Sequence, residues 1–103
     1  MSYIQIEITF DKREESVELA ALLLNEKLVA DGQISEINSV FNFEGKHYDR
    51  SEWLLSAKTK KSLYLEVEEF IKKQHSFKVP QIMATELKFG SKEYFDWIDE
   101  NTK

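Results

Sequence analysis

The chain of 103 residues contains no cysteine, and this absence excludes several classes of function at once. A protein without thiols has no disulfide bond, no thiolate metal site and no cysteine nucleophile. A heavy-metal chaperone that binds its ion through a Cys-Xaa-Xaa-Cys pair is excluded for the same reason.

Glycine is also scarce, with only Gly32, Gly45 and Gly90 in the chain. Phosphate-binding loops need several closely spaced glycines, so no loop of that kind is present. The chain also lacks the Gly-Xaa-Ser-Xaa-Gly sequence of serine hydrolases, and its two histidines do not form part of a recognisable nucleophilic triad. We therefore expect a protein that is not an enzyme.

Basic residues are outnumbered, because 14 Lys and Arg stand against 19 Asp and Glu and leave a net charge of −5. Binding to nucleic-acid phosphates needs a basic face, so we expect no nucleic-acid partner and no RNA-recognition domain. No apolar run approaches the length of a membrane span, and Met1–Gln5 lacks the features of a signal peptide. We expect a soluble, cytoplasmic protein with no membrane partner, folded as a single domain over residues 1–103.

The first part of the chain has the periodicity of a strand and then of a helix. Alternate residues from Ile4 to Phe10 are apolar, which is typical of a strand with one buried face. Asp11 and Glu14 have the spacing of a capping box, so a helix is expected from about Lys12 to Leu28. Its expected buried stripe consists of Val17, Ala20, Ala21, Leu24 and Leu28.

A long β-hairpin is predicted around Glu44-Gly45. Weak alternation over 34–43 and clearer alternation over 47–59 flank this pair, and glycine accepts the positive φ angle of a tight turn. Trp53, Leu55 and Ala57 fall on one face of the second arm. Such a ribbon is long for a chain of this size, so we expect its strands to pair with those of neighbouring subunits.

The remaining elements complete a known arrangement. A helix is expected over about 62–75 with an inner stripe that includes Val67 and Ile71, a strand over 79–89, and a short helix that starts at Ser91. The order is that of an α+β, ferredoxin-like βαββαβ fold: an antiparallel sheet with both helices on one face, a long central hairpin and an extra C-terminal helix.

Five segments in the same order resemble the CutA, or divalent-cation tolerance, family, and they cover almost the whole chain. They are Glu26–Ala30, Ser39–Lys46, Lys58–Thr59, His75–Ile82 and Gly90–Ile98. The resemblance implies a ferredoxin-like subunit, a tight homotrimer, structural similarity to the nitrogen-regulatory signal proteins, and a role in tolerance of divalent metals, with copper binding among members.

The chain departs from the family pattern at its metal-related positions. Asp31 stands where the family often has a cysteine, and Ile8 stands where some members have a second one. Gln81 replaces a glutamate that follows the proline. Soft copper ligation needs thiolate or thioether donors. Any divalent ion, whether copper, zinc or nickel, is therefore expected to use His75, Asp31 or other carboxylates, with His75 binding through its neutral imidazole. The alternatives are that His75 sits at a favourable helix end and that Asp31 is a turn residue beside Gly32.

Lys46, Glu52 and Lys58 are candidates for a ligand cleft, because their even spacing places all three on one face of a strand. Such a cleft would bind an anion at a subunit boundary, and the alternative is a solvated or cross-strand-paired face. Trp53, Tyr94 and Trp97 are expected to be anchors of the core or of the trimer, although Tyr94 and Trp97 are also suited to stacking on a ligand.

The preferred function is a non-enzymatic, homotrimeric signalling or binding protein of divalent metal tolerance, with no cofactor other than a divalent cation. The alternative is a small ferredoxin-like enzyme of the acylphosphatase type, for which Arg13 is the only candidate phosphate-binding arginine.

Overall fold

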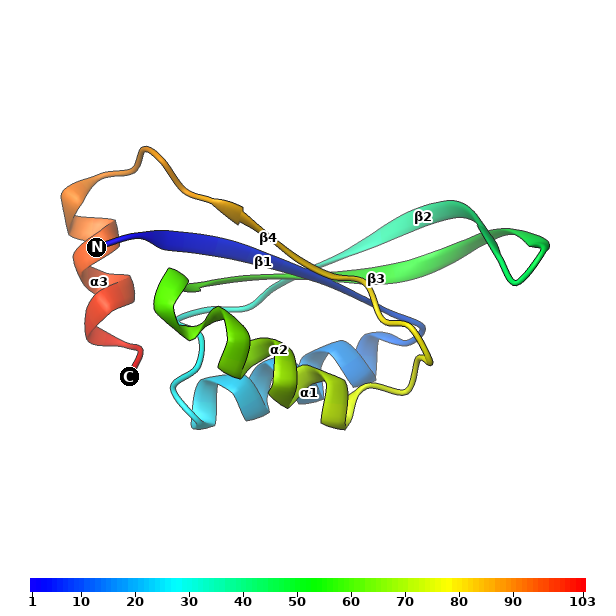
Figure 1. Cartoon of the computed structure of the whole chain (residues 1–103), viewed down its shortest axis with the longest axis horizontal. Coiled ribbons are helices and arrows are strands. Elements are labelled where there is room, and N and C mark those ends of the chain that lie inside the picture. Colours follow the sequence, from blue (N-terminus) through cyan, green and yellow to red (C-terminus); the bar gives the residue numbers. More distant parts are fainter.

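Four strands form one antiparallel sheet in the spatial order β2–β3–β1–β4 (Figure 1). The computed structural model describes residues 1–103. A short 3₁₀ turn (Lys61–Leu63) precedes the second helix. The elements are β1 (Tyr3–Phe10), α1 (Arg13–Asn25), β2 (Gln33–Phe43), β3 (Lys46–Lys60), α2 (Tyr64–Gln74), β4 (Ile82–Glu86) and α3 (Lys92–Glu100).

This arrangement is the predicted α+β, ferredoxin-like fold. Figure 1 shows α1 and α2 on the same face of the sheet, and α3 as an additional helix at the end of the sheet where the N-terminus lies. The first strand is central and pairs with both β3 and β4. It therefore carries much of the core.

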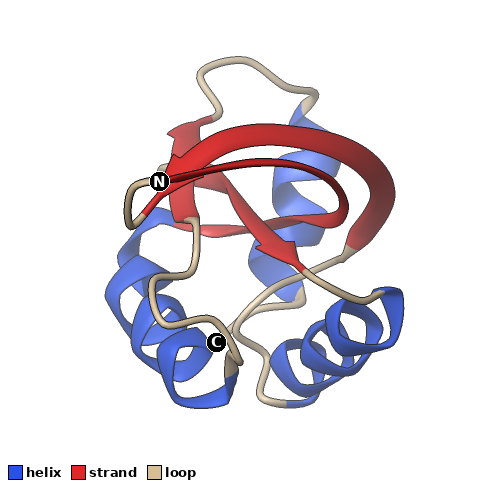
Figure 2. Cartoon of the chain, turned by 90° about the vertical axis from the view of Figure 1, so that its right-hand side faces the viewer, coloured by secondary structure: helices blue, strands red, loops and turns tan.

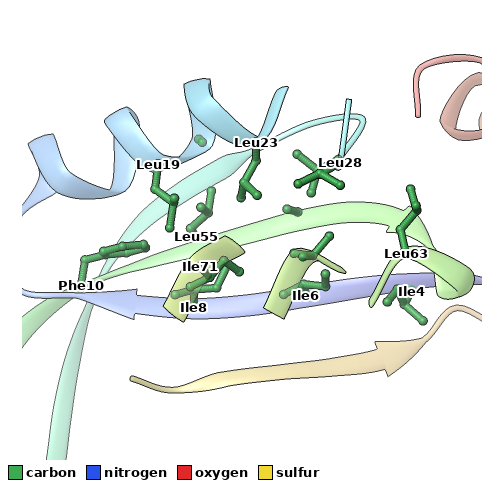
Figure 3. Close-up of a cluster of buried hydrophobic side chains, with 14 residues drawn as sticks. Ile4, Ile6, Ile8, Phe10, Leu19, Leu23, Leu28, Leu55, Leu63 and Ile71 are labelled. Atoms are coloured by element: carbon green, nitrogen blue, oxygen red, sulfur yellow. The ribbon is translucent and has the colours of Figure 1, made fainter. Parts of the chain in front are cut away.

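The core lies between this sheet and the first two helices. Ile4, Ile6, Ile8 and Phe10 point to the helical face and are almost fully buried, as their alternation predicted. Burying each of these side chains contributes about 1.5–3 kcal/mol relative to leaving it exposed. Figure 3 shows Leu19 and Leu23 of α1 pointing towards the same cluster.

The predicted boundaries of α1 and its cap are wrong. The N-cap is Lys12 rather than Asp11, and no side chain caps the helix, so the capping box does not form. The helix ends at Asn25, three residues before the predicted end, because Lys27 adopts a positive φ of 56°. A left-handed residue cannot continue a right-handed helix.

The predicted buried stripe of α1 is right at Ala20 and Leu28 but wrong at Val17, Ala21 and Leu24, which are exposed. Ser16, Leu19, Ala20 and Leu23 are buried, whereas Val17 and Leu24 are 40% and 43% exposed. The helix is apolar at every position from 19 to 24, so two overlapping sets of apolar residues have helical spacing. The set that packs on the sheet includes Ser16. Its buried hydroxyl is not left unpaired, because it donates to the Arg13 carbonyl at 2.6 Å.

The predicted long hairpin is confirmed. Glu44 and Gly45 both have positive φ angles, 49° and 78°, and form a two-residue turn between the paired residues Phe43 and Lys46. Pairing of β3 with β1 ends at Trp53, so the outer part of β2 and β3 continues as a two-stranded ribbon beyond the sheet. We call this part, residues 37–52, the ribbon. Figure 2 shows it curving rather than running straight.

The last strand is shorter than predicted. We expected a strand over 79–89, but β4 spans only Ile82–Glu86, which pair with Ile8–Ile4 of β1. Pro80, which precedes the strand, has no N–H to donate to a sheet. The second helix ends at Gln74, one residue before the predicted end.

The terminal helix begins where predicted. The Ser91 side chain accepts a hydrogen bond from the Tyr94 N–H at 3.2 Å and caps α3. The residues that anchor this helix, however, are Ile98, which is fully buried, and Phe95, which is partly buried and stacks on Tyr3 with ring centroids 4.7 Å apart. The predicted anchors Tyr94 and Trp97 stack on each other at the surface and lie outside the core of the single chain.

Candidate functional site

A cavity of about 710 Å³ lies between the ribbon and the segment that links α2 to β4. Its walls carry four aromatic side chains, with Phe41, Phe43 and Tyr48 from the ribbon and Phe77 from the linking segment. Pockets that hold small molecules usually have volumes of about 300–1,000 Å³ and mostly apolar linings with a few polar groups. We call this space the ribbon cavity.

Arg50 is the central polar residue of the ribbon cavity. Its guanidinium lies 5.7, 5.9 and 5.5 Å from the ring centroids of Phe41, Tyr48 and Phe77. These distances lie within the range of cation–π attraction. An Arg50 amino group donates to a Glu52 carboxylate oxygen at 3.2 Å. The Arg50 Nε atom is buried and has no acceptor.

Glu52 fixes the position of this arginine. The Glu52 side chain is only 6% exposed, whereas that of Arg50 is 39% exposed. Burying a carboxylate is costly unless a cation pairs with it, so the buried partner holds the arginine in place. The arginine thus presents the accessible charge of the pair.

A second polar cluster surrounds Lys58 on the same strand, farther from the turn. Its ammonium donates to the Gln33 side-chain oxygen at 2.6 Å and contacts Asp31 at 3.5 Å. The other Asp31 oxygen accepts the Lys58 backbone N–H at 3.0 Å. The Tyr94 hydroxyl donates to Asp31 at 3.2 Å. Burial, followed by the nearby Asp31 charge and hydrogen bond, raises the pKa of Tyr94 above its ordinary value.

The three predicted cleft residues are not brought together within one chain. Glu52 lines the ribbon cavity, Lys58 belongs to the second cluster, and Lys46 is exposed beside the turn. Lys46 and Lys58 are 12 positions apart on β3, which corresponds to about 40 Å along a strand. Period-two counting placed these residues on a common face, but it gives no information on their separation.

His75 is bound within the fold through both ring nitrogens. Its Nε2 donates to the Thr9 carbonyl at 2.7 Å, and its Nδ1 accepts the Phe77 N–H at 3.0 Å. The ring also stacks on Phe10 with centroids 4.6 Å apart. A metal ion would need one of these nitrogens, so it would have to displace an internal hydrogen bond.

Asp31 and His75 lie at different ends of β1. Asp31 contacts Lys58, which pairs with Gln5, whereas His75 contacts Thr9. Four residues of a strand span about 13 Å, so the two side chains of one chain do not meet on one ion. No group of three or more His, Asp or Glu side chains comes together with the geometry to hold a metal.

The chain matches the family described as CutA1 divalent ion tolerance protein over residues 4–101. It is 38% identical over 98 residues to the divalent-cation tolerance protein CutA of Archaeoglobus fulgidus, which covers 95% of this chain and 96% of that protein. It is 35% identical to the chloroplastic protein CutA of Arabidopsis thaliana, covering 97% of this chain and 56% of the relative.

Solved structures have the same fold. The structure described as the periplasmic divalent cation tolerance protein CutA from Archaeoglobus fulgidus aligns with a TM-score of 0.95 at 37% identity, covering 98% of this chain and 99% of that one. The structure of CutA1 from Oryza sativa aligns with a TM-score of 0.95 at 33% identity, covering 100% of this chain and 95% of that one. The chain belongs to the CutA1 divalent ion tolerance family.

Ile8 and Asp31, the two positions at which the resemblance led us to compare this chain with cysteines, have different surroundings here. Ile8 is fully buried among the apolar side chains of the core, where it has no access to a metal ion. Asp31 is partly exposed but is bonded to Lys58 and Tyr94. None of the helices in this CutA1 chain is long and apolar enough to cross a membrane.

Sequence reasoning did not single out Arg50 or Phe77, the two residues that define the ribbon cavity. Arg50 stands two positions before Glu52 and between aromatic residues of the hairpin, and this pattern was visible. Phe77 is 27 positions from Arg50, and no local periodicity connects them. Only the curved ribbon brings the ring over the guanidinium.

Proposed function

We propose that this chain is a non-enzymatic, homotrimeric protein of divalent metal tolerance that binds a divalent cation or a small ligand at its subunit boundaries in the cytoplasm. The observation that carries this proposal is the match to the CutA1 divalent ion tolerance family over residues 4–101.

Open strand edges support the trimer. In the order β2–β3–β1–β4, the first and last strands each have one edge without a partner, and β2 is 11 residues long. Apolar side chains are exposed on or beside these strands, with Val40 on β2 and Met83 on β4. Long open edges invite pairing with another chain, so pairing between subunits would protect them.

Copper, zinc and nickel are the proposed cations, and His75 and Asp31 remain the candidate ligands. Each is already hydrogen-bonded within the fold, so binding by either would break existing contacts. We therefore propose that the ion binds weakly and that Cu(II), Ni(II) and Zn(II) are preferred over Cu(I), because imidazole and carboxylate are harder ligands than thiolate.

The acylphosphatase alternative gains no support from the surroundings of Arg13. This residue is exposed at the first position of α1, where its carbonyl accepts the Ser16 hydroxyl. A phosphate-binding loop needs glycines and free backbone N–H groups around the arginine, and the helix occupies that place.

Light scattering of the purified chain tests the proposal. We expect a mass near three times 12.2 kDa at micromolar concentration. Val40→Lys places a charge on the open edge and should reduce the trimer fraction, whereas Leu65→Lys is the matched control on the exposed side of α2. A mass near one chain for the wild type would refute the trimer.

A further inference from the structure

The geometry points to the ribbon cavity as a binding site for a small organic anion with a flat ring, whose carboxylate pairs with Arg50 and whose ring packs on the surrounding aromatic side chains. This inference rests on the proposed function, because it gives a chemical class to the small ligand of a non-enzymatic binding protein.

Arg50 has spare hydrogen-bonding capacity. A guanidinium carries five N–H donors in a fixed plane, and the structure assigns one side-chain hydrogen bond to it, the bond to Glu52. The buried Nε donor has no acceptor, which is costly in a folded protein. A carboxylate is the planar acceptor that matches the guanidinium fork through two parallel bonds. Glu52 therefore holds the Arg50 guanidinium in position, and its remaining N–H groups are free to bind a carboxylate.

The charges of the cavity wall favour an anion over a cation. Arg50 and Lys78 stand against Glu52 among the lining residues, which leaves one positive charge. Glu52 is 6% exposed and already paired with Arg50, so it offers little to an incoming cation. Lys78 contacts Glu44 at 3.4 Å, but both side chains are largely exposed, and such surface pairs are weak.

The aromatic lining favours an organic anion over an inorganic one. Phe41 and Tyr48 stack with centroids 5.2 Å apart, and Phe77 lies on the other wall of the cavity. The aromatic side chains add little to the binding of phosphate or sulfate, which have no apolar surface. A ligand with a flat ring, in contrast, can pack on these side chains, and both surfaces are then removed from water. The volume of about 710 Å³ admits a molecule larger than a single ring.

The Nε–H signals in a ¹H–¹⁵N spectrum provide a direct measurement, because Arg13 and Arg50 are the only arginines in the chain. The full chain, in the oligomeric state in which it is purified, is titrated with benzoate, benzylammonium and inorganic phosphate separately. Arg13→Gln assigns the two signals and serves as the matched control, since Arg13 does not line the cavity. We expect benzoate to shift the Arg50 signal with a Kd of about 1 mM, as suits so small a ligand, and to leave Arg13 unmoved.

Variants separate the roles of charge and shape. Arg50→Lys keeps the charge but loses the planar fork, and we expect at least threefold weaker benzoate binding, followed through backbone amide shifts around the cavity. The double variant Arg50→Gln, Glu52→Gln leaves no unpaired buried charge, and we expect at least tenfold weaker binding. If the double variant does not fold, Arg50→Lys and Phe77→Leu provide the same comparison for the guanidinium and for the ring.

Three results would overturn the inference: no shift with benzoate, an equal or larger effect of benzylammonium or phosphate, or undiminished benzoate binding in the Arg50 variants. Light scattering of the same samples separates this inference from the proposed function. If the wild-type chain is trimeric but does not bind benzoate, the ligand class is refuted and the proposed assembly stands. If the wild-type chain is monomeric, the proposed assembly is refuted.

Discussion

His75 shows how a side chain that suits a metal ion can be committed to the fold instead. Its residue type and its place after α2 made it a candidate ligand, but its two ring nitrogens are bonded to the Thr9 carbonyl and the Phe77 N–H. Arg50 shows the opposite case, because its local sequence gave no sign of the contact that places the Phe77 ring over its guanidinium. The partners of a residue, more than its type, decide which chemistry remains available to it.

Replacing His75 tests both of its roles. His75→Ala loses two hydrogen bonds and the stack on Phe10, so we expect the free energy of unfolding to fall by about 2–3 kcal/mol. His47→Ala, on the exposed turn end of the ribbon, should change stability little and is the matched control, since these are the only histidines. Denaturant unfolding measures the stability. Calorimetry with Cu(II), Ni(II) and Zn(II) should show weaker binding for His75→Ala than for His47→Ala, and tight Cu(I) binding would contradict the assignment.

Trp53 and Leu55 allow a comparison of burial on one strand face. Both point to the helices, but Leu55 is fully buried whereas Trp53 is only partly buried beside the core. We expect Leu55→Ala to cost about 2–5 kcal/mol and Trp53→Ala less than the 3–5 kcal/mol typical of a buried Trp. Urea titrations that rank Trp53→Ala as the more destabilising would show that the indole gains burial elsewhere, for example in an assembly.

At the level of elements, α3 is held by a few specific contacts. Its residues Ile98 and Phe95 pack in a small cluster with Tyr3 and Ala30. The Tyr94 hydroxyl donates to Asp31, and Asp99 contacts Lys60 at 3.6 Å. The Lys103 N–H donates to the Lys27 carbonyl and joins the end of the chain to the turn after α1. These contacts connect the last helix and the end of the chain to segments 39 or more residues away in the sequence.

The Tyr94 contact predicts a dependence on high pH. Its pKa is raised from 10.0, chiefly by burial and then by Asp31, so the folded protein keeps this proton where the unfolded chain loses it. The stability from Tyr94 is therefore complete below pH 10 and is lost as the pH rises through the folded pKa. At neutral pH, Tyr94→Phe should lower the free energy of unfolding by about 0.5–1.5 kcal/mol, because the hydrogen bond to Asp31 is lost. Above pH 10, the variant should lose less stability than the wild type does.

Thermal unfolding between pH 7 and pH 11 measures this difference. Tyr48→Phe, on the ribbon away from α3, is the matched control and should follow the wild type. Equal losses for Tyr94→Phe and the wild type above pH 10 would show that the raised pKa of Tyr94 does not contribute to the alkaline behaviour.

The whole molecule is extended for its length. Its radius of gyration is 14.1 Å, whereas a compact domain of this size has about 12.8 Å, and its longest dimension is 44 Å. Only 23 of 103 residues are buried, and none of the ribbon residues belongs to the main core cluster. A single chain therefore leaves a long element outside its main core, and burying that element against neighbouring chains would add to stability.

Association predicts that the melting temperature depends on concentration. If the chain is most stable as a trimer, then mass action should raise the Tm by several degrees between 1 and 100 µM. Circular dichroism at both concentrations measures this shift, and a lysozyme sample run alongside controls for concentration artefacts. A Tm that stays constant over this range would mean that each chain folds independently of its neighbours.

The sequence by itself determined the elements whose causes are local. Alternation defined β1, the Glu44-Gly45 pair defined the turn, and Ser91 defined the start of α3, because each depends on neighbours within a few residues. The order of the elements then restricted the topology to the ferredoxin-like arrangement.

Only the tertiary structure decided which of two apolar stripes α1 buries, where β4 ends and which polar side chains meet. The buried stripe depends on the sheet that the helix packs against, and β4 is defined by its pairing with Ile4–Ile8 of β1, which is distant in the sequence. Arg50 meets Phe77 across 27 positions, and Asp31 meets Lys58 across another 27. These contacts arise from the curvature of the ribbon and the packing of distant segments, for which no periodicity along the chain provides a signal.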